Sequence, residues 1–74
     1  MEATYHQNKA HRLLRLLELL EQKAWRPHEL RKELGLGERA IFDYLLEAEA
    51  LAERLGLEFR HDRLRGLYWV EVRE

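Results

Sequence analysis

Residues 27–34 of this chain read Pro-His-Glu-Leu-Arg-Lys-Glu-Leu, residues 35–37 read Gly-Leu-Gly, and Glu38-Arg39-Ala40-Ile41-Phe42 opens the stretch that follows. Proline favours the first position of a helix, and Leu30 and Leu34 repeat at helical spacing. Gly35 suits the left-handed conformation that ends a helix, so a second helix begins near Gly37. Two helices joined by so short a turn are typical of a helix-turn-helix, whose second helix can lie in the major groove of DNA.

A longer helix is predicted before this unit, from about Asn8 to Lys23, with Asn8 as its N-cap and residues 1–7 as a frayed start. The apolar residues at helical spacing form a core stripe of Ala10, Leu13, Leu14, Leu17, Leu20 and Ala24. Leu16 and Leu19 lie off this stripe. A helix that is apolar on more than one face is either central in its domain or in contact with a partner.

The helix after the turn is predicted to run to about Leu55, where Gly56 ends it. Its core stripe consists of Ile41, Leu45, Ala48, Leu51, Ala52 and Leu55. Alternating residues then predict two strands, Leu57–His61 and Leu67–Arg73, joined by a loop over Asp62–Gly66. Arg26 precedes Pro27 and is therefore expected to be extended. Trp25 lies just before it and is predicted to add a short third strand.

These elements predict an α+β fold, a winged helix-turn-helix with three helices and a small antiparallel β-hairpin wing, in a single domain over residues 1–74. The expected core consists of Leu13, Leu17, Leu20, Leu30, Leu34, Ile41, Leu45, Leu51, Tyr68 and Val70.

Composition limits the function classes. The chain has 74 residues, no cysteine and no apolar run that approaches a membrane span or a signal peptide, so we expect a cytoplasmic protein without a membrane partner. The formal net charge is −1. Over residues 26–55 the acidic side chains outnumber the basic ones by two, although neutralised phosphates supply most of the affinity of a DNA-binding domain.

From His11 onward the order of motifs resembles the N-terminal winged-helix domain of DeoR-type and WYL-domain transcriptional regulators. Those domains have a leucine-rich first helix ending near an aromatic residue, a threonine-proline start, an ELA..LG helix, a SERTIYRDL helix and a wing closing on GY. The matching segments here are residues 11–17, 25–27, 29–30, 34–35, 37–42 and 66–69. The resemblance implies a DNA-binding module, here without the sensor domain of those regulators. Gly37 replaces the family's serine, Asp43 its basic residue and Tyr44 its next acidic residue, and Arg39 remains.

The predicted DNA-binding residues come from three segments. The helix after the turn would present Glu38, Arg39, Phe42 and Asp43, the wing Arg60, Arg63 and Arg65 beside His61, and the helix before the turn Arg26, His28 and Lys32 with Arg31. Other interpretations are an idle solvated face with an Arg39–Asp43 ion pair, an apolar protein-binding patch of Phe42 and Leu46, and a wing that only solubilises the hairpin. Arg31 and Lys32 can likewise pair with Glu29 and Glu33 or be solvated.

The preferred hypothesis is therefore a DNA-binding module of transcriptional regulation that acts on double-stranded DNA as a homodimer. The alternative is a winged helix re-used for protein–protein interaction, because the helix after the turn is acidic. A possible dimer interface consists of Leu16, Leu19, Trp69 and Val72. No metal, cofactor or enzymatic activity is expected: the four histidines have no ligand-like spacing, serine is absent, and no glycine-rich phosphate loop occurs.

Overall fold

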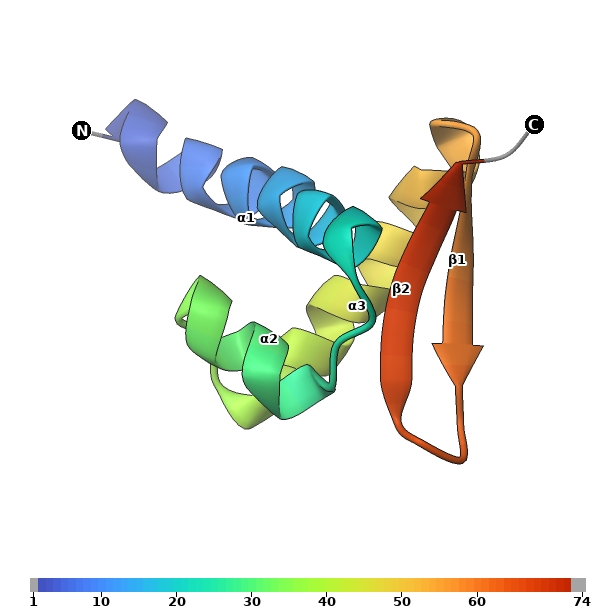
Figure 1. The fold of residues 1–74 in the computed structure, drawn as a ribbon. Coiled ribbons are helices and arrows are strands. Elements are labelled where there is room, and N and C mark those ends of the chain that lie inside the picture. Colours follow the sequence, from blue (N-terminus) through green and yellow to red (C-terminus); the bar gives the residue numbers. More distant parts are fainter. Residues whose placement is uncertain (1, 73–74) are drawn as a thin grey trace.

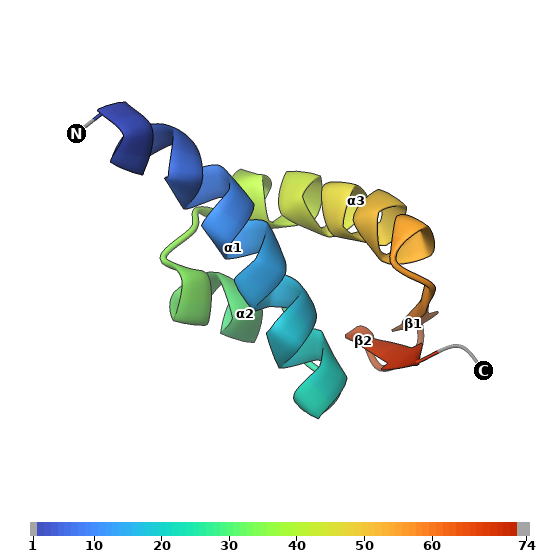
Figure 2. The ribbon, with the colours of Figure 1, turned by 90° about the horizontal axis from the view of Figure 1, so that it is seen from above.

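The computed structural model describes the backbone of residues 2–72 and the side chains of residues 9–72. The elements follow the order α1 (Glu2–Gln22), α2 (Pro27–Leu34), α3 (Glu38–Arg54), β1 (Leu57–Asp62) and β2 (Leu67–Val72). The three helices pack together, and the antiparallel hairpin stands at one end of them, beside α3 and the C-terminal end of α1 (Figures 1 and 2). This is the predicted α+β layout of a winged helix.

The first helix starts earlier than predicted. α1 begins at Glu2 rather than at Asn8, so the assignment of Asn8 as N-cap is wrong, and residues 2–7 continue the helix instead of forming a frayed start. No proline or glycine interrupts the chain between Glu2 and Gln22. A single asparagine is only slightly unfavourable inside a helix, so it does not by itself mark a boundary. Met1 lies outside the described residues.

The helix-turn-helix follows its local signals closely. Arg26 is extended, Pro27 is the first residue of α2, and the Glu29 carboxylate accepts a hydrogen bond of 3.2 Å from the Arg26 backbone N–H. This hydrogen bond holds the pKa of Glu29 below its usual value. Gly35 adopts the left-handed conformation with φ of 68° and ends α2, while the Leu36 N–H binds the Arg31 carbonyl at 2.8 Å. The chain therefore passes from α2 into α3 through only three residues.

The hairpin pairs β1 with β2 in one continuous register, from Leu57 opposite Val72 to Asp62 opposite Leu67. β1 is one residue longer than predicted, and the expected end of β2 at Arg73 lies outside the described residues. Trp25 forms an antiparallel bridge with Tyr68 through backbone hydrogen bonds of 2.8 and 2.7 Å. This bridge is isolated and the sheet has two strands, so the predicted third strand is reduced to one pair of residues. The Trp25 ring also donates from Nε1 to the Leu19 carbonyl at 2.7 Å. The link between α1 and α2 is thus held against the hairpin.

One apolar core joins all five elements. Its buried members are Leu16, Leu17, Leu19, Leu20, Leu30, Leu34, Leu36, Ile41, Leu45, Ala48, Ala52 and Val70. Leu13, Leu51 and Tyr68, which were predicted as core, are partly buried against it. Among residues 2–72, no helix is long and apolar enough to cross a membrane.

The buried face of α1 differs from the predicted stripe. Leu16 and Leu19 are 0% and 3% exposed, so they belong to the core and their assignment to a dimer interface is wrong. Leu14, predicted as core, is instead 54% exposed. α1 packs against α2, α3 and β2 together, and a helix contacted from several sides buries a wider face than one stripe. Ala10 and Leu55, predicted for the two core stripes, are exposed as well.

Candidate nucleic-acid interface

The face of α3 that was predicted to meet DNA is exposed. Phe42 is 51% and Leu46 68% exposed, and Arg39 lies one turn before Phe42. Glu38 and Asp43 are exposed too. Residues three and four apart share a helix face, so these side chains form one surface. Among the side chains described here, Arg39 and Asp43 form no ion pair with each other.

The wing tip, residues 63–66, is shaped by Asp62. One carboxylate oxygen, Oδ1, accepts hydrogen bonds from the backbone N–H groups of Leu64 at 3.1 Å and Arg65 at 3.2 Å. The Gly66 N–H binds the Asp62 carbonyl at 2.8 Å, and Gly66 has φ of 68°. Arg65 lies 3.9 Å from the second oxygen of Asp62, whereas Arg63 has no ion pair within residues 9–72. The tip therefore presents one free and one loosely paired arginine to solvent.

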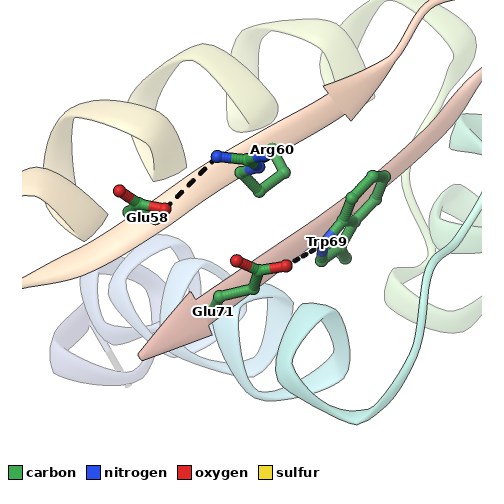
Figure 3. A network of polar contacts seen from close by, with 4 residues as sticks. All are labelled: Glu58, Arg60, Trp69 and Glu71. Carbon is green, nitrogen blue, oxygen red and sulfur yellow. Dashed lines mark hydrogen bonds and ion pairs between the residues drawn. The ribbon is translucent and has the colours of Figure 1, made fainter. Parts of the chain in front are cut away.

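Arg60 does not join the other two wing arginines. Side chains alternate along a strand, so Arg60 lies on the opposite face of the hairpin from Phe59 and His61. Its guanidinium is 3.3 Å from a Glu58 carboxylate oxygen (Figure 3). The wing's basic surface is thus confined to its tip, and the outer face of the hairpin is locally neutralised.

The same outer face carries Trp69, whose Nε1 donates to a Glu71 carboxylate oxygen at 3.0 Å (Figure 3). Val72 is 70% exposed, but it lies on the other face of β2 from Trp69 because the two are three residues apart. With Leu16 and Leu19 in the core, the four residues predicted for a dimer interface do not form one surface.

Some of the predicted DNA contacts from α2 lie beside the exposed face of α3 and others do not. Arg26, His28 and Lys32 are exposed, and His28 lines a hollow of about 350 Å³ between α2 and α3 with Arg31, Glu38 and Phe42. Arg26 and Lys32 do not line this hollow. Arg31 is partly buried, and its Nη1 donates to the Leu36 carbonyl at 3.5 Å, at the limit of a hydrogen bond. The structure thus places only His28 and Arg31 directly beside the exposed face of α3.

A groove that the sequence did not predict lies between α3 and the hairpin. This α3–hairpin groove encloses about 500 Å³ and is lined by Phe42, Leu45, Leu46, Glu49, Phe59, His61, Arg63 and Tyr68. The His61 and Tyr68 rings stack at 3.9 Å with 9° between their planes, and Phe59 meets Tyr68 edge-on at 5.9 Å. The period-2 pattern of β1 places Phe59 and His61 on one face, which is the signal that was available. The groove joins a cationic wing tip to an apolar floor.

Within the described part of the chain, no three histidine, aspartate or glutamate side chains gather as metal ligands would. No known protein family, characterised protein or solved structure matches this chain. The resemblance to DeoR-type and WYL-domain regulators therefore stays a prediction, and a functional proposal has to rest on the geometry of α2, α3 and the wing tip.

Proposed function

We propose that this protein is a DNA-binding module of transcriptional regulation, which inserts α3 into the major groove and holds the backbone with its wing tip. The observation that carries the proposal is the joint exposure of Arg39 and Phe42 in the first turns of α3, within a winged-helix arrangement. Burial of these two side chains would have excluded contact with base edges. The wing tip with Arg63 and Arg65 provides a second, phosphate-directed surface.

Each side chain has a defined role in this proposal. Arg39 pairs with a guanine edge or a phosphate, and Phe42 packs on a thymine methyl. Glu38 accepts from a cytosine amino group, while Arg63 and Arg65 bind phosphates. His28 lies beside Glu38 and Phe42, where α2 crosses the backbone. Asp43 lowers the affinity for phosphates, so we expect sequence readout to contribute more here than in a basic domain.

Fluorescence anisotropy with duplex DNA at several salt concentrations tests the proposal. Arg39→Ala should weaken binding to the selected site by about 5- to 100-fold, the cost of one good base contact. Arg63→Ala should lower affinity for all duplexes alike and reduce the salt slope by about one. Arg15→Ala is a matched control, because Arg15 is exposed on α1, outside the three segments of the proposed interface. There it pairs with Glu18 of the same helix at 3.7 Å. The absence of binding at low salt would overturn the proposal, as would an equal loss with the control.

A specific observation also favours the second candidate, a protein-binding winged helix. Phe42 and Leu46 line the α3–hairpin groove together with Glu49, and Asp43 and Glu47 line a second hollow on the other side of Leu46. Apolar patches ringed by charge are typical of protein interfaces. A chain that fails to bind duplex DNA at low salt, and whose partner binding is lost in both Phe42→Ala and Leu46→Ala, would support this function. The lack of cysteine supports a cytoplasmic location for either function.

A further inference from the structure

The hairpin has one closed and one open edge. β2 is paired with β1 on one side and bridged to Trp25 on the other. β1 is paired only with β2, so its outer edge has no strand partner among residues 2–72. Figure 1 shows β1 as the outermost strand, with no helix beyond it. The register along β1 is continuous, without a bulge or proline that would protect the edge. Such an edge exposes backbone N–H and C=O groups that can pair with another strand.

The charged residues are unevenly distributed along this open edge. Glu58 lies near the start of β1. Together with Glu49 and Glu53 of α3 it lines a hollow of about 240 Å³. Arg60, which lines the same hollow, and His61 lie toward the end of the strand. Asp62 ends the strand with its carboxylate bound to Arg65 and to two N–H groups of the wing tip, and Arg63 follows. The first half of the strand and its surroundings, with Glu58, Glu49 and Glu53, are therefore more acidic than the second half. Two copies of such a strand attract one another when they run antiparallel, because the more acidic half of each then faces the half of the other that carries Arg60 and His61.

We propose that the occupant of this edge is a second copy of the chain, joined antiparallel along β1 so that the two hairpins form one four-stranded sheet. Facing side chains in such a pair must lie on the same side of the sheet, which restricts the register. A register centred on Phe59 satisfies this condition. It places Phe59 opposite Phe59 of the second copy, and Glu58 opposite Arg60 of the second copy, twice by symmetry.

The local geometry is compatible with this exchange of partners. Glu58 and Arg60 already meet at 3.3 Å within one copy, and their side chains are 41% and 51% exposed. They can turn to the second copy without leaving a buried charge behind. This interface replaces the predicted surface on α1, whose leucines are buried, and it does not rest on DNA binding.

A charge exchange tests the pairing by sedimentation from micromolar to millimolar concentration. Glu58→Arg alone places two arginines opposite each other, and Arg60→Glu alone places two glutamates opposite each other. Each should raise the Kd of the homodimer by about tenfold or more, because two symmetric pairs change from attraction to repulsion. A mixture of the two variants should form a heterodimer at the wild-type concentration, and the double variant should dimerise again. Arg15→Glu on α1 is the control and should leave the mass unchanged.

The outcomes that overturn the inference are distinct. A wild-type chain that stays monomeric at millimolar concentration leaves the edge to another partner, and a dimer whose mass neither reversal affects uses another surface. Failure of the mixed variants to associate would also contradict it. Circular dichroism of each variant confirms that the fold is retained. A dimer that does not bind DNA would contradict the proposed function alone. A monomer that binds DNA would contradict this inference alone.

Cysteine cross-linking tests the register, since the chain contains no cysteine of its own. Phe59→Cys should give a disulfide-linked dimer, because facing Cα atoms in an antiparallel pair are about 4.5–5.5 Å apart and within disulfide reach. His61→Cys is the control on the same face of β1. Its two copies would be about 14 Å apart in this register, since each lies opposite Leu57 of the other copy. Cross-linking at position 61 rather than 59 would overturn the register.

Discussion

At the scale of single residues, two glycines separated by one leucine have opposite requirements. Gly35 has φ of 68°, a conformation that side chains with a Cβ adopt only with strain. Gly37 has φ of −80° and ψ of 174°, which is ordinary extended backbone, and a Cβ built there meets no atom within 4 Å. Gly37 is the N-cap of α3 and provides no side-chain acceptor for the first N–H groups of that helix.

Replacement of the two glycines should therefore change stability in opposite directions. Gly35→Ala should lower the free energy of unfolding by about 1–2 kcal/mol, the cost of the left-handed conformation for a residue with a Cβ. Gly37→Ser should raise the free energy of unfolding by a few tenths of a kcal/mol, because the hydroxyl oxygen can cap α3. Urea unfolding of both variants measures the difference. Equal effects at the two positions would contradict the assigned backbone conformations.

At the scale of elements, α1 is the centre of the fold. It packs against α2, α3 and β2, and its C-terminal end is tied to the hairpin through Trp25, whose Nε1 donates to the Leu19 carbonyl. The Lys23 ammonium lies 4.2 Å from the centre of the Trp25 ring, a cation–π contact at the same junction. A helix in this position buries Leu16 and Leu19 in addition to the residues of a single stripe.

Leu14 and Leu16 of α1 are two residues apart and differ in burial, so they test this arrangement. Leu16→Ala should lower the free energy of unfolding by about 2–5 kcal/mol, since it removes a fully buried side chain and leaves a cavity. Leu14→Ala, at an exposed position with the same side chain, should stay within about 0.5 kcal/mol of the wild type. Thermal unfolding followed by circular dichroism distinguishes the two. A small effect at Leu16 would mean that its side chain is not in the core.

At the scale of the whole molecule, two polar contacts link stability to pH. The Lys9 ammonium meets a Glu47 carboxylate oxygen at 2.9 Å and connects α1 with α3. The hydrogen bond and charge of Glu47 hold the pKa of Lys9 above 10.5. Stability from this contact is complete below pH 10.5 and is lost as the pH rises through the folded-state pKa. The pKa of Glu29 is held below 4.5, so its contribution is complete above pH 4.5 and is lost as the pH falls.

Matched variants should reveal these two contributions on opposite sides of the pH scale. The difference in Tm between the wild type and Glu29→Gln should be constant at neutral pH and shrink below pH 4.5. The difference between the wild type and Lys9→Met should shrink above pH 10.5 instead. Both contacts are accessible to solvent, so both differences are small and decrease with added salt. Differences that do not change with pH would contradict the two pKa assignments.

The sequence by itself determined the helix-turn-helix and the hairpin, because their boundaries depend on local chemistry. Pro27 starts α2, Gly35 ends it, and Gly66 closes the wing tip, each through backbone preferences that need no distant partner. The exposed Arg39 and Phe42 also followed from helical spacing within α3.

Only the tertiary structure decided the burial of Leu16 and Leu19, the ion pair between Glu58 and Arg60, and the α3–hairpin groove. Burial depends on how many elements surround a helix, and periodicity within one helix carries no information about its neighbours. The groove depends on the pairing of His61 with Tyr68 and on how the hairpin lies along α3. Such long-range packing is set by the core as a whole, whereas the alternation along β1 indicates only that Phe59 and His61 share a face.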